Sequence, residues 1–314
     1  MRIGIIGAGG ISDTHVRAAR SIDGVSVVAV YGANVEKTRA LADSAGAVAY
    51  GELGAFLSHP MDMVAIGSPS GLHGDQAIAS ARRGLHVLVE KPLDINTTKI
   101  DSLLSEAKRA GVSVGVFFQE RMVPEVAALK ARLDGGEIGA PLFGHGQVRW
   151  YRPPEYYAAS RWRGTWALDG GGALMNQGIH TVDLLLWLLG PVVRVTGRTA
   201  TRLHTIEVED TAAALLEFAN GAIGTIEATT AAFPGFPRRL EITGMKGSLV
   251  HEDPPRPAVV ADATPHRRVL EDFIDAVRSG RQPACDGLEG RRSVAVVEAI
   301  YRSSQSGQSE EPRT

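Results

Sequence analysis

The chain has 314 residues, of which 44% are hydrophobic and 22% charged, and its formal net charge is −2. This composition is typical of a globular protein with a sizeable core, and the absence of a long basic run argues against nucleic acid or an anionic membrane as a partner. The single cysteine, Cys285, excludes an internal disulfide, and no Cys/His spacing predicts a metal site. No apolar run reaches the roughly 18 residues of a membrane helix, so we expect a cytoplasmic protein.

Short apolar runs alternate with helical patterns in the first third of the chain. Continuous apolar strands between helices predict a parallel sheet that is covered on both faces, with right-handed crossovers. We therefore expect a doubly wound α/β domain over residues 1–119. The predicted strands lie at 3–7, 25–32, 63–68, 86–92 and 112–118, and the helices between them at 11–22, 35–46, 73–84 and 97–111.

Strand patterns then follow one another in the rest of the chain. Because "NG" at 220–221 is a strong hairpin signal, with "KG" at 246–247 a weaker one, they predict a mostly antiparallel open sheet. We expect an α+β domain over 120–314 for substrate binding and oligomerisation, with a frayed tail from 303 on. The strand patterns lie at 141–152, 192–203, 210–220, 221–233 and 238–252, and the helices at 123–134, 173–189, 267–280 and 289–304.

The stretch "GIIGAGGIS" places a glycine-rich turn between the first strand and the first helix. Glycine permits a tight turn and lets a pyrophosphate approach the helix N-terminus, where free N–H groups favour an anion. The spacing is a variant of the dinucleotide fingerprint, with Ser12 in place of its third glycine, and a plain tight turn is the alternative. The pattern predicts a Rossmann domain whose contacts with NAD or NADP include Gly7, Gly9, Gly10 and Ile11.

The end of the second strand bears on which of the two cofactors binds. NAD-binding domains usually carry an acid about 20 residues after the turn, where it bonds the ribose 2′-OH, but here Gly32 stands near that position. We expect Gly32, Asn34 and Lys37 to contact the cofactor. Because no acid stands there to repel a 2′-phosphate, this region slightly favours NADP over NAD. The alternative is that Lys37 only lies on the exposed face of the next helix, which leaves NAD open.

Several further motifs recur in a fixed order: "SP…H" at 68–73, "EKP" at 90–92, "DGGG" at 169–172, "N-x-G-x-H-x-x-D" at 176–183, and the closing "GLEGRR…AIYRSS". Over nearly its whole length the sequence resembles the glucose–fructose oxidoreductase/inositol 2-dehydrogenase/MocA (Gfo/Idh/MocA) family. The resemblance implies a Rossmann domain, then an α/β domain whose open sheet often forms the oligomer interface, and hence a homodimer or homotetramer. It also implies NAD(P)-dependent oxidation or reduction of one carbon of a sugar, nucleotide sugar or cyclitol.

Lys91 is the lysine of the "EKP" motif, and the resemblance implies an acid/base or substrate-orienting role for it. A doubly wound sheet binds its ligands at the carboxyl ends of the strands. A lysine beside an oxidised, positively charged nicotinamide ring is pushed toward its neutral form and can accept a hydroxyl proton. The alternative is that Glu90 and Lys91 form a solvated pair at a strand end.

Asn176, His180 and Asp183 are spaced i, i+4 and i+7, so on an α-helix they would share one face. A polar stripe within an apolar helix needs a partner, and the glycine run at 170–172 would let something approach closely. Together with the resemblance, this favours a substrate-facing catalytic His180 over a buried core histidine. Many family members have Asp where this chain has Asn176, which cannot share a proton with an imidazolium, so we expect Asn176 to bind a substrate hydroxyl.

Weaker candidates lie around these motifs. Trp162 and Arg163 belong to the aromatic and basic loop "YRPPEYYAASRWRGTW", in which arginine suits a carboxylate or a phosphate and loop packing is the alternative. Arg121 either contacts the substrate or bridges the two domains. The remaining cofactor candidates are Ser68, Pro69, His73, Glu90, Lys91 and Gln119.

The predicted function is hydride transfer between nicotinamide C4 and a secondary alcohol or ketone carbon of a sugar-like substrate. Lys91 would carry the proton, with His180 facing the same ring. Two alternatives stay open: a glycoside hydrolase that uses NAD transiently, and a non-catalytic dinucleotide sensor on the same fold.

Overall fold

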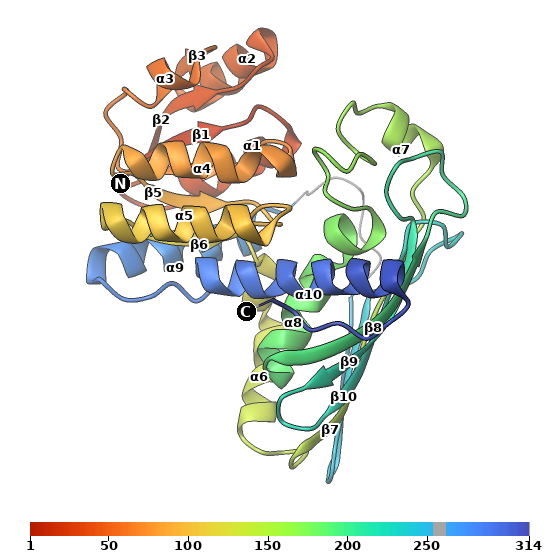
Figure 1. Cartoon of the computed structure of the whole chain (residues 1–314). Helices are drawn as coiled ribbons and strands as arrows, with labels where there is room; N and C mark the ends of the chain where they lie inside the picture. The colour runs from red at the N-terminus through yellow and green to blue at the C-terminus, as the bar shows by residue number, and fades with distance from the viewer. Residues whose placement is uncertain (254–261, 314) are drawn as a thin grey trace. The chain divides into compact units, whose positions relative to one another are not determined.

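The computed structural model describes residues 1–253 and 262–313, and the chain divides into two compact units (Figure 1). Unit 1 consists of Met1–Gln119 and a later stretch that ends at Gly290, and unit 2 starts at Glu120 and resumes at Arg291. The first break falls where the sequence analysis placed it. Helix α9 (Thr264–Ser279), however, was assigned to the second domain, whereas it packs against α1 in unit 1. The helical pattern identifies an apolar face on α9 but not which unit that face covers.

Unit 1 contains a six-stranded sheet in the order β3-β2-β1-β4-β5-β6, and every strand pair is parallel. This confirms the predicted doubly wound class. Because the order reverses at β1 and crossovers are right-handed, the helices of the two halves cover opposite faces. The strands are β1 (Arg2–Ile6), β2 (Ser26–Tyr31), β3 (Val48–Tyr50), β4 (Met63–Ile66), β5 (His86–Val89) and β6 (Val114–Val116), and the helices are α1 (Gly10–Arg20), α2 (Val35–Ala45), α3 (Leu53–Phe56), the 3₁₀ turn η1 (Ser70–Leu72), α4 (His73–Arg82) and α5 (Thr97–Ala110).

Unit 2 contains a second six-stranded sheet, in the order β12-β11-β7-β10-β9-β8. Its pairs are antiparallel except for β7 with β10, and both predicted hairpin turns connect paired strands. The strands are β7 (Pro141–Arg149), β8 (Val192–Ala200), β9 (Thr211–Phe218), β10 (Ile223–Thr229), β11 (Arg239–Gly244) and β12 (Gly247–Glu252), and the helices are the 3₁₀ turn η2 (Gln119–Met122), α6 (Pro124–Asp134), α7 (Pro154–Ala158), the π-helix η3 (Ala173–Gly178), α8 (Ile179–Leu189) and α10 (Gly287–Ser306), which begins in unit 1.

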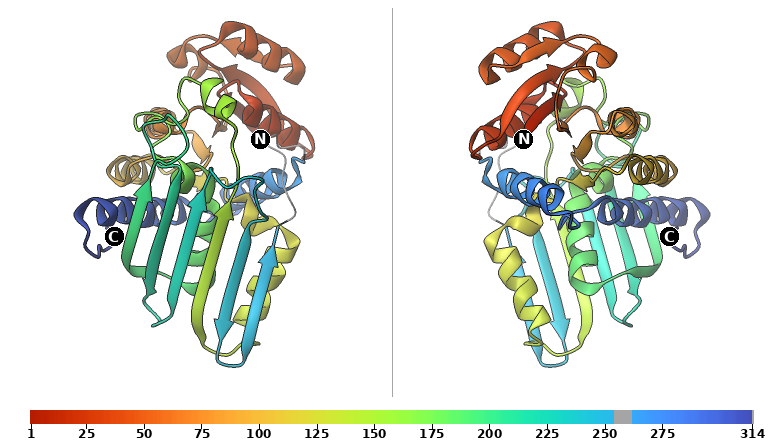
Figure 2. Two further views of the ribbon diagram at one scale, coloured as in Figure 1. Left: turned by 90° about the vertical axis from the view of Figure 1, so that its right-hand side faces the viewer. Right: turned by 90° about the vertical axis from the view of Figure 1, so that its left-hand side faces the viewer.

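Only one face of the second sheet carries helices of its own unit. Figure 2 shows α6 and α8 against that face in its right panel, and the strands facing the viewer in its left panel. The residues of β9 and β10 alternate accordingly between buried and exposed or half-buried. Alternation of this kind marks a sheet with one face on a core and one face open.

The chain's tail is ordered as far as the structure describes it, so the predicted fraying is wrong. The backbone N–H of Val195 donates to Glu310 O at 2.8 Å, and that of Glu310 donates to Val195 O at 2.9 Å. The tail therefore pairs with the edge strand β8, a long-range contact that a polar composition does not reveal. Within the described ranges, no helix is long and apolar enough to cross a bilayer, and no group of three or more His, Cys, Asp or Glu side chains could hold a metal ion.

Candidate active site

The glycine turn after β1 has the features of a pyrophosphate cradle. Gly7 has a φ of 107°, and a Cβ there would lie 2.7 Å from Gly67 O, so no side chain fits. Gly9 and Gly10 border open space. Gly9 caps α1 without a side-chain acceptor, which leaves the N–H groups of the first turn for an anion. Ser12 is fully buried against this turn, in the place of the third fingerprint glycine. These residues fit a dinucleotide.

The end of β2 explains why no acid stands near the ribose position. A Cβ on Gly32 would lie 2.6 Å from Thr38 Oγ1 and 3.1 Å from Ala8 Cβ, so a larger residue does not fit there. The side chain of Asn34 instead caps α2 by accepting the Lys37 N–H at 2.9 Å. The side chain of Lys37 is exposed. It is therefore accessible to a phosphate.

His73 is the first residue of α4 and is buried, and it joins the loops that follow β4 and β5. Its Nδ1 lies 2.8 Å from Pro92 O and its Nε2 lies 2.9 Å from Ser68 O. Burial lowers the pKa of His73, although both carbonyl oxygens oppose this shift. His73 thus positions the loops around it instead of pointing at a ligand. The other candidates here, Ile11, Ser68, Pro69 and Gln119, are half-buried.

Lys91 lies directly after Glu90 at the carboxyl end of β5, and its peptide bond to Pro92 is cis. Glu90 is not solvated, because only 5% of the residue is exposed. Its Oε2 accepts the Lys91 N–H at 3.2 Å, and its Oε1 lies 2.9 Å from Nε2 of His15, on α1. The structure therefore excludes the solvated-pair interpretation for Glu90, whose carboxylate holds the backbone of Lys91 instead.

Two further rings complete this buried cluster. His266, on α9, brings its Nε2 to 3.5 Å from Oε1 of Glu90, and His15 stacks on Phe117 with the ring centroids 4.4 Å apart. Burial by itself would raise the pKa of Glu90, but the two imidazoles outweigh it and hold that pKa well below its usual range. Burial lowers the pKa of His15, which favours the neutral imidazole. Glu90 is thus an ionised carboxylate held between two buried histidines.

In unit 2 the predicted helix is confirmed over Ala173–Leu189, but its first part is the π-helix η3. The π-helix ends at Gly178, so the i, i+4 spacing of Asn176 and His180 crosses from the π-helix into α8. The Asn176 amide donates through Nδ2 to Oδ1 of Asp169, while its own Oδ1 accepts from Gln177 Nε2 at 2.8 Å. Oδ2 of Asp169 in turn accepts the Gly164 N–H at 2.8 Å. Asp169 and Gln177 therefore fix the orientation of the Asn176 amide.

The stretch around α8 holds a buried ion pair. Nε of Arg121 donates to Asp183 Oδ2 at 2.9 Å, and the two side chains are 4% and 0% exposed. The Arg121 guanidinium also lies 5.4 Å from the Trp187 ring centroid. The charge of Arg121 is thus balanced inside unit 2, and its contact with the substrate stays a prediction. His180, on the same helix, is 9% exposed.

The loop between β7 and η3 gathers aromatic and basic side chains. The guanidinium carbon of Arg163 lies 4.4 Å from the Tyr156 ring centroid and 5.3 Å from that of Trp162. Arg152 lies 5.3 Å from the same Tyr156 ring and donates to Gln177 Oε1 at 2.8 Å. Trp162 and Arg163 therefore belong to one cluster with Asn176, linked through Arg152 and Gln177.

Two glycines of the run before η3, Gly171 and Gly172, serve internal packing. A Cβ on Gly171 would lie 2.1 Å from Tyr301 Oη, and one on Gly172 would lie 1.9 Å from Glu209 O. Glu209 accepts the N–H groups of Gly172 and Leu174 at 2.9 and 2.8 Å, and burial raises its pKa. The close approach that the sequence analysis expected is thus made by Glu209 and Tyr301.

Sequence reasoning identified the glycine turn, Glu90, Lys91, Asn176 and His180, but it missed the residues that hold them. His15 could have been noticed, because it lies with Ser12 on the apolar face of the first helix. Arg152 could have been noticed because it is the first of the basic residues in the aromatic loop. No local signal marks His266 or Glu209, whose partners lie far away in the chain.

Comparison with known proteins gives consistent results over the whole chain. A family model described as "Oxidoreductase family, NAD-binding Rossmann fold" matches residues 1–118, and one described as "GFO/IDH/MocA C-terminal domain" matches residues 126–250. The chain is 27% identical to the myo-inositol 2-dehydrogenase of Thermotoga maritima, covering 96% of each chain.

Two solved structures are more similar in sequence. The WlbA dehydrogenase from Bordetella pertussis, in complex with NADH and UDP-GlcNAcA, is 34% identical with a TM-score of 0.93, covering 100% of this chain and 99% of that one. The corresponding complex from Chromobacterium violaceum is 31% identical with a TM-score of 0.91, covering 99% and 95%.

Proposed function

Because the chain belongs to the Gfo/Idh/MocA family of NAD(P)-dependent oxidoreductases, we propose that its substrate is a nucleotide sugar or a closely related sugar, oxidised at one secondary alcohol. The chain is a dehydrogenase that acts on CH–OH groups. The observation that carries the choice of a nucleotide sugar is the 34% identity over the full chain to a structure that holds UDP-GlcNAcA. The cyclitol dehydrogenase of Thermotoga maritima is less similar, at 27%.

The residues of unit 1 hold the cofactor and move the proton. The turn formed by Gly7 and Gly9 and the first turn of α1 bind the pyrophosphate, because the N–H groups at the start of α1 and the open space beside Gly9 and Gly10 suit an anion. When bound, the nicotinamide ring accepts a hydride at C4. Lys91 accepts the proton of the substrate hydroxyl, and Glu90 fixes the backbone from which the Lys91 side chain extends.

The residues of unit 2 bind and orient the sugar. Asn176 bonds a substrate hydroxyl through an amide that Asp169 and Gln177 hold in one orientation. His180 orients the reacting alcohol and assists the proton transfer. A sugar held in this way needs no large rearrangement of the side chains before the chemical step.

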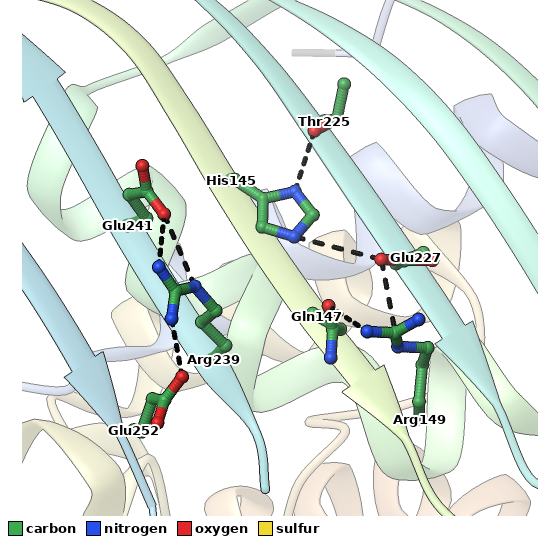
Figure 3. Close-up of polar contacts among 8 residues, drawn as sticks. All are labelled: His145, Gln147, Arg149, Thr225, Glu227, Arg239, Glu241 and Glu252. Atoms are coloured by element: carbon green, nitrogen blue, oxygen red, sulfur yellow. Dashed lines mark hydrogen bonds and ion pairs between the residues drawn. The ribbon is translucent and has the colours of Figure 1, made fainter. Parts of the chain in front are cut away.

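We also propose that the open face of the second sheet is the oligomer interface. One row across it carries Arg198, Glu227, Gln147, Arg239 and Glu252 on neighbouring strands. Figure 3 shows Arg239 between Glu241 and Glu252, and Glu227 between His145 and Arg149. A face with both charge signs can pair with a copy of itself about a two-fold axis.

Exposed apolar side chains support this interface. Leu215 is 42% exposed, Ile223 47% and Val250 48%. A hollow of about 440 Å³ lies beside Leu215 and His145. We further propose a cytoplasmic location, since Cys285 is buried and is the single cysteine.

A two-step assay tests the proposed activity. Binding of NAD and NADP is measured by calorimetry, and the purified protein is then offered UDP-sugars, hexoses and myo-inositol while the absorbance of the reduced nicotinamide is followed. We expect the protein to bind the nucleotide, and we expect a UDP-sugar to cause net reduction of the nicotinamide. Sugar cleavage without net reduction would instead identify a redox-cycling hydrolase. Nucleotide binding with no turnover of any sugar would favour a sensor.

A further inference from the structure

Two arginines of unit 2 surround a single tyrosine ring. The guanidinium carbons of Arg163 and Arg152 lie 4.4 and 5.3 Å from the ring centroid of Tyr156. A second aromatic ring flanks each one, Trp162 at 5.3 Å from Arg163 and Trp150 at 5.2 Å from Arg152. Aromatic faces orient a guanidinium and hold it in place. They do not neutralise its charge.

Neither charge is balanced within the part of the chain that the structure describes. No carboxylate lies within ion-pair distance of Arg152 or Arg163, and the Nε atom of each is buried without a hydrogen-bond partner. The buried arginines elsewhere in unit 2 differ, since Arg121 pairs with Asp183 and Arg238 pairs with Glu120 at 2.7 Å. Two partly desolvated cations near one ring repel each other, and an anion bound to both would remove that cost.

The arginine cluster is connected to the residue proposed to bind the sugar. Arg152 donates to Gln177 Oε1 at 2.8 Å, and Gln177 Nε2 donates to Asn176 Oδ1 at 2.8 Å. A group bound by Arg152 is therefore adjacent to a hydroxyl bound by Asn176. Arginine presents a planar fork of donors that matches the oxygens of a carboxylate or a phosphate.

We propose that Arg152 and Arg163 form an anion subsite that binds a carboxylate or phosphate group of the sugar substrate. This inference rests on the proposed function, because it assigns a charged group to the substrate of that same site. Neutral cyclitols and free neutral hexoses are then poor substrates. UDP-GlcNAcA carries both kinds of anion, a uronate carboxylate and a diphosphate, so it serves as the reference probe.

The unmodified enzyme provides the first test. Initial rates with UDP-GlcNAcA, UDP-GlcNAc, free N-acetylglucosaminuronate and myo-inositol give four values of kcat/KM. We expect the first to exceed the last by at least about 100-fold, the combined effect of two charge-assisted contacts. Retained activity on UDP-GlcNAc identifies the diphosphate as the bound group, and retained activity on the free uronate identifies the carboxylate. Equal kcat/KM for myo-inositol and UDP-GlcNAcA overturns the proposal and leaves the dehydrogenase activity standing.

Variants locate the subsite. Arg152→Gln and Arg163→Gln should each raise KM for UDP-GlcNAcA by about 10- to 100-fold, while the affinity for NADH, followed by its fluorescence, stays unchanged. Arg161→Gln is the matched control, because Arg161 lies in the same loop with its side chain exposed, and it should keep the original KM. Equal losses in all three variants would show a general charge effect and overturn the proposal.

The fold of each variant is checked by thermal unfolding. Arg163→Lys keeps the charge and serves if Arg163→Gln unfolds early, with an expected KM between those of the wild type and Arg152→Gln. A lysine variant with a KM as high as that of a charge-free substitution would contradict an anion subsite. If no nucleotide binds to the wild type, the proposed function itself fails, whatever the arginine variants do.

Discussion

Nε2 of His15 lies 2.9 Å from Oε1 of Glu90, with side chains that are 1% and 7% exposed. His15 is on the helix that follows the glycine turn, and Glu90 directly precedes Lys91. The other oxygen of the same carboxylate accepts the Lys91 N–H at 3.2 Å. A single buried carboxylate therefore connects the helix proposed to hold the pyrophosphate with the residue proposed to carry the proton.

Removal of this carboxylate should cost both stability and catalysis. In Glu90→Ala, His15 and His266 lose their shared partner, and we expect the free energy of unfolding to fall by about 3 kcal/mol. In Glu90→Gln the amide oxygen can still accept from His15, so the loss should be smaller, about 1 kcal/mol. Urea unfolding measures both. Equal stability of Glu90→Ala and the wild type would contradict the role of the cluster.

The catalytic effect of Glu90 is separable from its effect on folding. If Glu90 positions Lys91, then Glu90→Gln should lower kcat more than it raises KM, and it should shift the pH dependence of kcat. A change in KM alone, with an unaltered pH profile, would indicate a purely structural contribution.

Replacement of Lys91 tests the proposed proton carrier. Lys91→Ala should lower kcat/KM by about 100-fold or more, since general acid–base catalysis contributes at least that factor. Lys91→Arg should be similarly impaired, because a guanidinium stays protonated. The Kd for NADH should change little in either variant, as measured by fluorescence titration. Substantial turnover by Lys91→Ala would rule Lys91 out as the proton carrier.

Asn176→Asp tests the contact with Asp169. The amide donates to Asp169, whereas a carboxylate at position 176 would face a like charge, and one of the two pKa values would rise. We expect a new ionisation in the pH profile of kcat/KM and lower activity on the alkaline side. Asn176→Ala removes the amide without adding charge, so it should lower activity without that new ionisation. Identical profiles for Asn176→Asp and Asn176→Ala would contradict the like-charge explanation.

Protonation of His15 and His73 should lower the stability of the protein as the pH falls from near neutral, whereas Asp94, whose pKa burial raises to about 6, acts in the opposite direction. Burial lowers the pKa of His15 and of His73 from the usual value of 6.5, so below that pH the unfolded chain binds protons that the folded chain does not. The free energy of unfolding then falls as the pH falls, by up to roughly 1.4 kcal/mol per pH unit for each histidine. Urea midpoints between about pH 7.5 and 5.5 measure the slope, and His15→Asn should make it shallower. A slope that His15→Asn leaves unchanged would contradict the assignment.

The open sheet face predicts a specific oligomer defect. Leu215→Asp places a charge on the proposed interface, where its desolvation opposes association, and the molar mass from light scattering should fall to that of a monomer. Leu288→Asp is the control, since Leu288 is 52% exposed at the start of α10 and not on that face. An unchanged mass for Leu215→Asp would exclude this face as the interface.

The parts of the fold that were predictable are those that local pattern determines. Apolar runs bounded by turns located β1, β4 and β5, and "NG" located the β9–β10 hairpin. The three-residue strand β3 and the four-residue helix α3 escaped notice, because so few residues show no periodicity. The partner of α9 also escaped notice, since an amphipathic face does not specify which surface it covers.

The same difference applies to the candidate site. The motif residues could be proposed because their chemistry is visible in the sequence, whereas contacts between residues far apart in the chain could not be predicted. Arg121 was predicted to contact the substrate or to bridge the domains, and its ion-pair partner Asp183, 62 positions away, was not foreseen. The glycines before η3 were predicted to let another group approach closely, and Tyr301 and the backbone of Glu209 make that approach at Gly171 and Gly172. In each case the contact is made by a residue that is distant in the sequence but belongs to the same unit.

The residues of unit 2 that are proposed to bind the substrate lie on a long excursion between two strands of one sheet. It leaves β7 at Arg149 and returns at Val192, and the backbone N–H of Arg152 is fastened to Thr230 O at 2.9 Å, just past β10. This anchoring contact is made by backbone atoms, so it does not depend on which side chains the excursion carries. Substrate preference in such an architecture can diverge by exchange of a few displayed residues, Arg152 and Arg163 among them, while the inherited scaffold persists unchanged.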